Sequence, residues 1–172
     1  MTDQSNGGGA AQNPPAAAPP SGQPQQAPLV VNAQYVKDLS FELPNAPNIL
    51  RRLNEQPQVQ VNVNVQAQLL GGDTYEVQLT LNTEAKIGEE ALFIVELVYA
   101  GVFTVQGVPQ DVLRPLLLIE CPRLLFPFAR AVIASLTRES SLPPMLIQPI
   151  DFADLYRRQA EHAVQAAQPG TA

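Results

Sequence analysis

The stretch VQVNVNVQAQLL, residues 59–70, constrains the fold most strongly, because apolar and polar residues alternate along its length. A period of two predicts a half-buried strand of an antiparallel sheet. The turn triplet GGD follows at residues 71–73, and the alternation then resumes over residues 74–87. The two alternating stretches therefore predict a β-hairpin.

Two further strands are predicted, one before and one after this hairpin in the sequence. Residues 90–105 are apolar on both faces, so this strand is either covered on both sides or presents apolar surface to a partner. Residues 34–43 contain the β-forming pair Tyr35 and Val36. Between residues 43 and 59 the prolines leave little room for a stable helix, and we expect a long crossover loop there.

The pattern changes to helical spacing over residues 109–140, which place leucine, phenylalanine and valine on one broad apolar face. Pro122 and Pro127 each remove a backbone hydrogen-bond donor, so this long helix should bend or restart between Cys121 and Pro127. The next segment, residues 141–150, contains three prolines and cannot be helical. It is nevertheless strongly apolar, so it either packs against its own domain or is available to a ligand.

Asp151 is a typical N-cap for a final helix that begins at Phe152. Together the predicted elements indicate an α+β fold. We expect a four-stranded antiparallel sheet with a long, proline-kinked helix and a C-terminal helix packed on one face.

Composition divides the chain into three parts. Residues 1–28 are mostly Gly, Ala, Pro and Gln and have too little apolar surface to offset the entropy of ordering the backbone, so we expect a disordered arm. Residues 29–161 are expected to form one domain, and residues 162–172 a flexible tail. The chain shows no secretory signal, no uninterrupted apolar span and only one cysteine, so we expect a cytoplasmic protein without stable membrane insertion.

The formal net charge is −6, and its distribution is more informative than its total. Residues 73–111 contain seven acidic residues and one lysine, so this segment carries a charge equal to that of the whole chain. An acidic surface repels a phosphate backbone, and we expect no nucleic-acid partner. Charge alone leaves two readings open, a solubilising face or a docking face for a basic partner.

Groups that could perform catalysis are few. Cys121 is the only cysteine and His162 the only histidine, so they cannot form a structural zinc site, and a nucleophile–base pair would need a long-range coincidence. No phosphate-binding glycine motif followed by lysine is present. We therefore expect no enzymatic activity, no metal and no cofactor, and we interpret Cys121 as a small apolar packing residue beside the helix bend.

Three segments carry a resemblance to a known family. They are YVKDLSFELPNAPN (residues 35–48), IGEEALFIVELVYAGVF (residues 87–103) and CPRLLFPFARAVIASLTRESSLPPMLIQPIDFADLY (residues 121–156). In order and without large gaps, they resemble SecB, the bacterial protein-export chaperone. The resemblance implies a homotetramer, a dimer of dimers, in which the long helices pack between two sheets. It places the following residues in the oligomer interface: Phe93, Val95, Leu97, Tyr99, Leu125, Phe128 and Val132.

The resemblance also implies a function: an ATP-independent chaperone, or holdase, that binds unfolded precursor polypeptides and delivers them to the export ATPase SecA. The implied client groove lies between the crossover loop and the loop joining the two helices. Its residues would be Phe41, Ile49, Leu50, Leu53, Leu142, Met145, Leu146 and Ile147. The implied SecA-binding surface consists of Asp38, Glu42, Ile94 and Glu96.

Two alternatives stay open at this point. One is a general or antitoxin-linked SecB-like chaperone with another delivery partner, against which the four residues of the SecA set argue. The other is a small enzyme that uses Cys121. Two departures from the family pattern are the long N-terminal arm and a crossover loop without a large aromatic residue.

Overall fold

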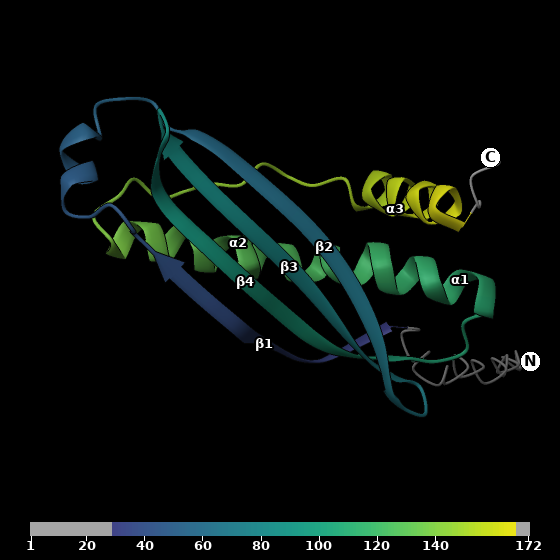
Figure 1. The fold of residues 1–172 in the computed structure, drawn as a ribbon. Helices are drawn as coiled ribbons and strands as arrows, with labels where there is room; N and C mark the ends of the chain where they lie inside the picture. Colours follow the sequence, from purple (N-terminus) through teal and green to yellow (C-terminus); the bar gives the residue numbers. More distant parts are fainter. Residues whose placement is uncertain (1–28, 168–172) are drawn as a thin grey trace, which may run out of the picture.

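Four long antiparallel strands form one twisted sheet (Figure 1). They are β1 (Leu29–Glu42), β2 (Gln58–Gly71), β3 (Thr74–Ile87) and β4 (Glu90–Val105), in the spatial order β1-β4-β3-β2. The structure is a computed structural model that describes residues 29–167, with side chains for residues 29–161. The predicted hairpin is confirmed as β2–β3, and the predicted arm of residues 1–28 lies outside the described residues.

The inner face of the sheet forms the core of the domain. Leu81 on β3 pairs with Leu97 on β4, and both side chains are fully buried. Gly101 lies on the same face, where an added Cβ would come within 2.8 Å of Leu125 Cδ2. A glycine is therefore required at this position, because it lets the long helix approach the middle of the sheet.

The long apolar helix is interrupted just before Pro122. It consists of α1 (Gln110–Pro115), a π-helical turn η2 (Leu116–Glu120) and α2 (Cys121–Glu139). The interruption precedes Pro122, because this residue has no N–H for the carbonyl of Leu118 and the wider turn accommodates its ring. The predicted restart near Cys121 is therefore confirmed, because α2 begins at Cys121, and the helix then continues through Pro127.

Two shorter elements complete the fold. The crossover loop contains a 3-10 helix, η1 (Asn48–Arg52), and the final helix is α3 (Phe152–Ala167). Asp151 caps α3 as predicted, since its Oδ1 accepts the N–H of Asp154 at 3.0 Å. This bond lowers the pKa of the Asp151 carboxyl. The helix continues to Ala167, into the segment predicted as a tail from residue 162, because alanine and glutamine favour helix up to Pro169.

Candidate binding sites

A groove of about 670 Å³ lies between β2 and the segment that joins α2 to α3. In Figure 1 this segment runs beside β2 along the sheet. Most of the lining is apolar and comes from two walls. The residues are Val59, Val61 and Val63 on β2, and Met145, Ile147, Pro149, Ile150 and Leu155 on the opposite side. Asp151 and Arg158 supply charge at the rim.

The segment opposite β2 is irregular but fixed to the end of α2. The buried Thr137 is the anchor, because its Oγ1 accepts the Met145 N–H at 2.9 Å and its carbonyl accepts the Leu142 N–H at 3.1 Å. Leu142 and Ile147 are buried, whereas Leu146 is 60% exposed. The four predicted client residues of this segment therefore differ in role: Met145 and Ile147 line the groove, Leu142 packs below it, and Leu146 points to solvent.

The crossover loop carries three of the other predicted client residues. Ile49 is buried and Leu50 packs against the core, whereas Leu53 is exposed. Phe41, the remaining predicted client residue, lies on β1, where it is half-buried and stacks on Phe93 with ring centroids 6.1 Å apart.

Two polar contacts hold the crossover loop against the start of β4. Asn45 Nδ2 donates to the Ala91 carbonyl at 2.9 Å, and Arg52 Nη1 lies 2.7 Å from Glu90 Oε2. The loop therefore lies at the end of the sheet where α2 ends (Figure 1), but the wall facing Met145 is made by β2 instead.

The valines of β2 are the groove residues that sequence reasoning missed. Their alternation indicates only the inner face of a strand. Because β2 is an edge strand and α2 lies over the middle of the sheet, part of that inner face stays uncovered, and Val59 is 44% exposed. An edge position could not be read from a local pattern.

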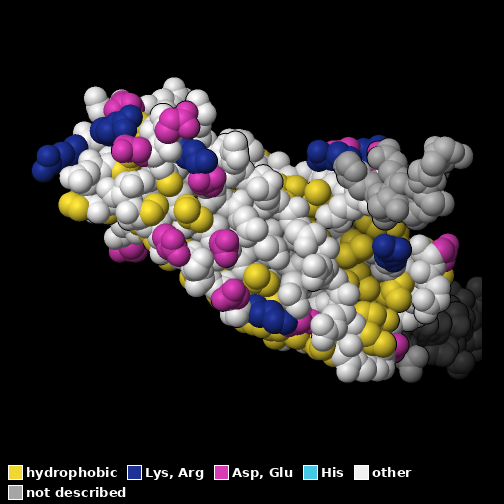
Figure 2. All heavy atoms as spheres, viewed as in Figure 1, with side chains coloured by type: hydrophobic (Ala, Val, Ile, Leu, Met, Phe, Trp, Pro, Cys, Tyr) yellow, Lys and Arg dark blue, Asp and Glu magenta, His cyan; other side chains and the backbone are white. Residues whose placement is uncertain are grey.

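The outer face of the sheet is polar and acidic. β1 pairs with β4 so that Glu42 lies opposite Ile94, Ser40 opposite Glu96 and Asp38 opposite Val98. The four predicted SecA residues therefore share one face, and Asp38, Glu42 and Glu96 are exposed. Within residues 29–161, no lysine or arginine forms an ion pair with these three carboxylates. Figure 2 shows acidic side chains spaced along this face among uncharged polar ones.

Glu76 on the same outer face is buried and has its own partners. Its carboxylate accepts hydrogen bonds from Lys37 Nζ at 2.7 Å, from the Tyr35 hydroxyl and from Gln78 Nε2 at 2.7 Å. The bonds from Lys37 and Tyr35 lower the pKa of Glu76 to about 2. Glu76 in turn raises the pKa of Tyr35. This cluster ties edge strand β1 to β3 across the small Ala100 of β4.

The predicted interface residues fall into two groups. Phe93, Val95, Leu97, Tyr99 and Leu125 lie in the core of the chain itself, so they have little surface left for direct contact with a second copy. Whether these five residues also contact a second copy therefore stays a prediction. Among the seven predicted interface residues, only Phe128, which is 52% exposed, and the half-buried Val132 present apolar surface, and both lie on α2.

Phe128 is held in place by Tyr99, since the two rings stack with centroids 6.4 Å apart. Together with Ala131, Val132 and Leu136, these rings line a shallow apolar depression on α2 and β4. This depression is the exposed part of the predicted interface.

Cys121 is buried, and burial raises the pKa of its thiol to about 12. A thiol with so high a pKa is a poor nucleophile at neutral pH, as expected for a packing residue. Among the described side chains, His, Cys, Asp and Glu do not gather in groups of three that could ligate a metal. None of the helices within residues 29–167 combines the length and apolar character that a membrane span requires.

Comparisons with known proteins agree with this architecture. The family model described as preprotein translocase subunit SecB matches residues 22–163. The protein-export protein SecB of Rhodopseudomonas palustris (strain TIE-1) is 51% identical over 148 residues, which cover 85% of this chain and 94% of the relative. The SecB of Mesorhizobium japonicum is 53% identical over 134 residues, which cover 78% of this chain and 80% of the relative.

A solved structure supports the fold. The SecB-like chaperone Rv1957 of Mycobacterium tuberculosis, in complex with a ChAD peptide from the Rv1956 HigA1 antitoxin, matches with a TM-score of 0.57. It is 13% identical in sequence, and the match covers 71% of this chain and 90% of that one. At this identity the likeness concerns the fold alone. The family match and the relatives at about half identity show that this chain belongs to the SecB family of protein-export chaperones.

Proposed function

We propose that this protein is an ATP-independent holdase that binds unfolded precursor polypeptides in the cytoplasm and delivers them to the export ATPase SecA. The observation that carries the proposal is the apolar groove between β2 and the α2–α3 segment. Unfolded chains expose apolar side chains, and burying them gains about 25 cal/mol per Å² without any nucleotide. Folded proteins hide the same side chains, so the groove discriminates by folding state.

The construction of the groove suits many different client sequences. One wall is a regular strand, and the other is an irregular segment anchored at Thr137, with Met145 at the groove. A methionine side chain has three rotatable bonds and adapts to differently shaped partners. Such a surface binds by apolar area instead of by a sequence motif.

The acidic outer face supports delivery to a basic partner. Asp38, Glu42 and Glu96 are exposed and without ion pairs among the described residues, so their charge is available to a partner. Ile94 adds a half-buried apolar contact among them. Because this face lies on the side of the sheet opposite to α2, SecA can dock on it while the groove holds a client.

Two exposed features support a homotetramer, a dimer of dimers. The first is the apolar depression around Phe128 on α2. The second is β1, a 14-residue edge strand that exposes Val30, Val31 and Val36. Long edge strands with exposed apolar residues are templates for pairing with another chain. Size-exclusion chromatography with light scattering should give four times the 18.6 kDa chain mass, whereas a monomer would contradict the assembly.

Client binding is tested with two neighbouring substitutions on β2. Val59→Asp places a carboxylate in the groove, and burying it should weaken binding of a permanently unfolded polypeptide about tenfold. Gln60→Asp on the opposite face is the matched control and should change affinity less than about twofold. Fluorescence titration of the labelled polypeptide measures both. Equal effects of the two variants would contradict the groove assignment.

SecA docking is tested by charge reversal. Glu96→Lys should weaken SecA binding about tenfold while client binding and the assembly mass stay unchanged. Glu89→Lys in the β3–β4 turn removes the same charge from the acidic segment but not from the docking face, and it should have a smaller effect. Unchanged SecA affinity for Glu96→Lys would reject this surface. If the unaltered protein binds clients but not SecA, the alternative of a general or antitoxin-linked chaperone with another delivery partner is correct.

A further inference from the structure

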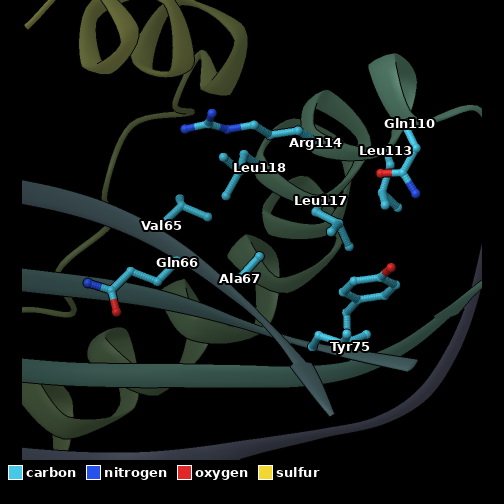
Figure 3. Close-up of a pocket in the computed structure, with 10 residues that line it drawn as sticks. Val65, Gln66, Ala67, Tyr75, Gln110, Leu113, Arg114, Leu117 and Leu118 are labelled. Atoms are coloured by element: carbon cyan, nitrogen blue, oxygen red, sulfur yellow. The ribbon is translucent and has the colours of Figure 1, made fainter. Parts of the chain in front are cut away.

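A second groove, of about 520 Å³, lies farther along β2, toward the β2–β3 turn. Val65, Ala67 and Leu69 of β2 and Tyr75 of β3 form one wall, and Leu113, Leu117 and Leu118 form the other. Figure 3 shows Leu117 and Tyr75 directed toward each other, whereas Gln66 points away from the helices. Leu69 is 58% exposed, and Figure 2 shows apolar side chains gathered at this end of the sheet. The described chain therefore leaves an apolar surface uncovered here.

The charged side chain at this groove, Arg114, is a hydrogen-bond donor, whereas the amide of Gln110 can both donate and accept. Arg114 extends along the rim, as Figure 3 shows, and Gln110 lies at the α1 end. Within residues 29–161, no carboxylate pairs with Arg114. A guanidinium group only donates hydrogen bonds. The groove therefore suits a ligand that is apolar and offers carbonyl acceptors to Arg114.

The N-terminal arm joins the sheet at this same end. Leu29, the first described residue, pairs with Val105, whose N–H donates to the Asp73 carbonyl in the β2–β3 turn at 2.8 Å. From β1 to β2 the sheet is three strand spacings wide, or about 14 Å. In an extended proline-type conformation each residue spans about 3.1 Å, so a few of the 28 preceding residues reach the groove.

The arm has the composition that the groove requires. Residues 14–20 read PPAAAPP, residues 14–28 carry no charge, and Pro24 and Pro28 follow. Proline has no N–H but keeps its carbonyl acceptor. Proline-rich segments also lose little entropy on binding to apolar grooves with aromatic walls. We propose that residues 14–28 of the arm dock into the groove between β2 and α1 of the same chain.

This docking would bury part of Leu69 and Tyr75. It does not depend on the proposed holdase role, because it can be tested without client or SecA. The arm is expected to compete only for the second groove, since the client groove beside Met145 has its own, separate lining.

Site-specific photocrosslinking on the full chain tests the proposal. Ser21→Cys carries a benzophenone maleimide, and the buried Cys121 stays unlabelled. After illumination, mass spectrometry should locate crosslinks at residues 65–75 and 110–118. A mixture of ¹⁵N-labelled and unlabelled protein shows whether the joined peptides come from one chain.

Two neighbouring substitutions provide the control. Leu69→Asp places a charge at the groove and should reduce the crosslink yield about tenfold, whereas Leu70→Asp, also exposed but outside the lining, should change it less than about twofold. Replacing Pro14, Pro15, Pro19 and Pro20 by glycine should also lower the yield several-fold. Crosslinks spread over the whole surface, crosslinks only between different chains, or equal yields in the two leucine variants would overturn the proposal.

Discussion

The two faces of the sheet share the same four strands but differ in what they contact. On β4, Leu97 points inward to Leu81 and the long helix and is fully buried, whereas its neighbour Glu96 points outward between Ser40 and Asn82 and is exposed. Side chains on successive residues of a strand lie on opposite faces. The comparison shows that neighbouring residues of one strand can serve different roles, one in stability and the next in partner recognition. Substitutions at adjacent positions should therefore affect one of these properties and leave the other unchanged.

The largest expected effect is on the inner face. Leu97→Ala removes a fully buried side chain opposite Leu81 and should lower the free energy of unfolding by about 2–5 kcal/mol. Urea unfolding at one fixed protein concentration measures it, because the stability of an oligomer depends on concentration. A loss below about 1 kcal/mol would mean that the two faces contribute alike.

Gly101→Ala tests the inner face from the opposite direction, by adding volume. The new Cβ would meet Phe103 Cε2 at 2.7 Å and Leu125 Cδ2 at 2.8 Å, so these side chains or the backbone must shift, at a cost of about 1–3 kcal/mol. Thermal unfolding should show a lower midpoint. Gly101→Ala should cost less stability in a Leu125→Ala background than in the unaltered protein, because the clash with Leu125 is then absent. An equal cost in both backgrounds would mean that the strain does not involve Leu125.

Glu76 is an exception on the outer face of the sheet, because its carboxylate is buried and should contribute to stability. Glu76→Gln disturbs the bonds from Lys37 and Tyr35 and should cost about 1–3 kcal/mol at neutral pH. The pKa of Glu76 in the folded chain, about 2, lies below the ordinary value of 4.5, so the ionised group stabilises the fold at neutral pH. That contribution is lost as the pH falls from about 4.5 to about 2.

The stability difference between the unaltered protein and Glu76→Gln should therefore shrink over this acidic range. Chemical unfolding of both proteins at a series of pH values measures it. A difference that stays constant down to pH 2 would show that Glu76 does not couple ionisation to folding.

The smallest effect on stability is expected from the exposed acids. Glu42→Gln and Glu96→Gln should each change the free energy of unfolding by less than about 0.5 kcal/mol, because neither carboxylate is buried or paired within residues 29–161. Both variants should still weaken SecA binding, measured by surface plasmon resonance. A large loss of stability would indicate that these acids support the fold, so that the outer face would contribute to stability as the inner face does.

The strands were predicted well because the alternation of apolar and polar residues can be recognised within a short stretch of sequence. The predicted strands at residues 74–87 and 90–105 have the bounds of β3 and β4, and β2 extends the predicted stretch by one residue at each end. β1 begins five residues earlier than predicted, at Leu29, because pairing with the long β4 extends it. The helix restart near Cys121 was predicted from proline chemistry, but the π-helical turn that precedes it was not.

The sequence by itself determined which residues alternate, where prolines forbid regular structure, and which motifs mark the family. Only the tertiary structure decided that β2 is an edge strand whose valines line a groove, that Gly101 makes room for Leu125, and that Tyr35 and Glu76 meet across Ala100. The physical reason is sequence separation. Alternation and proline effects act within a few residues. Strand order and helix contacts join residues as far apart as Leu29 and Val105, and they are fixed only when the whole sheet has formed.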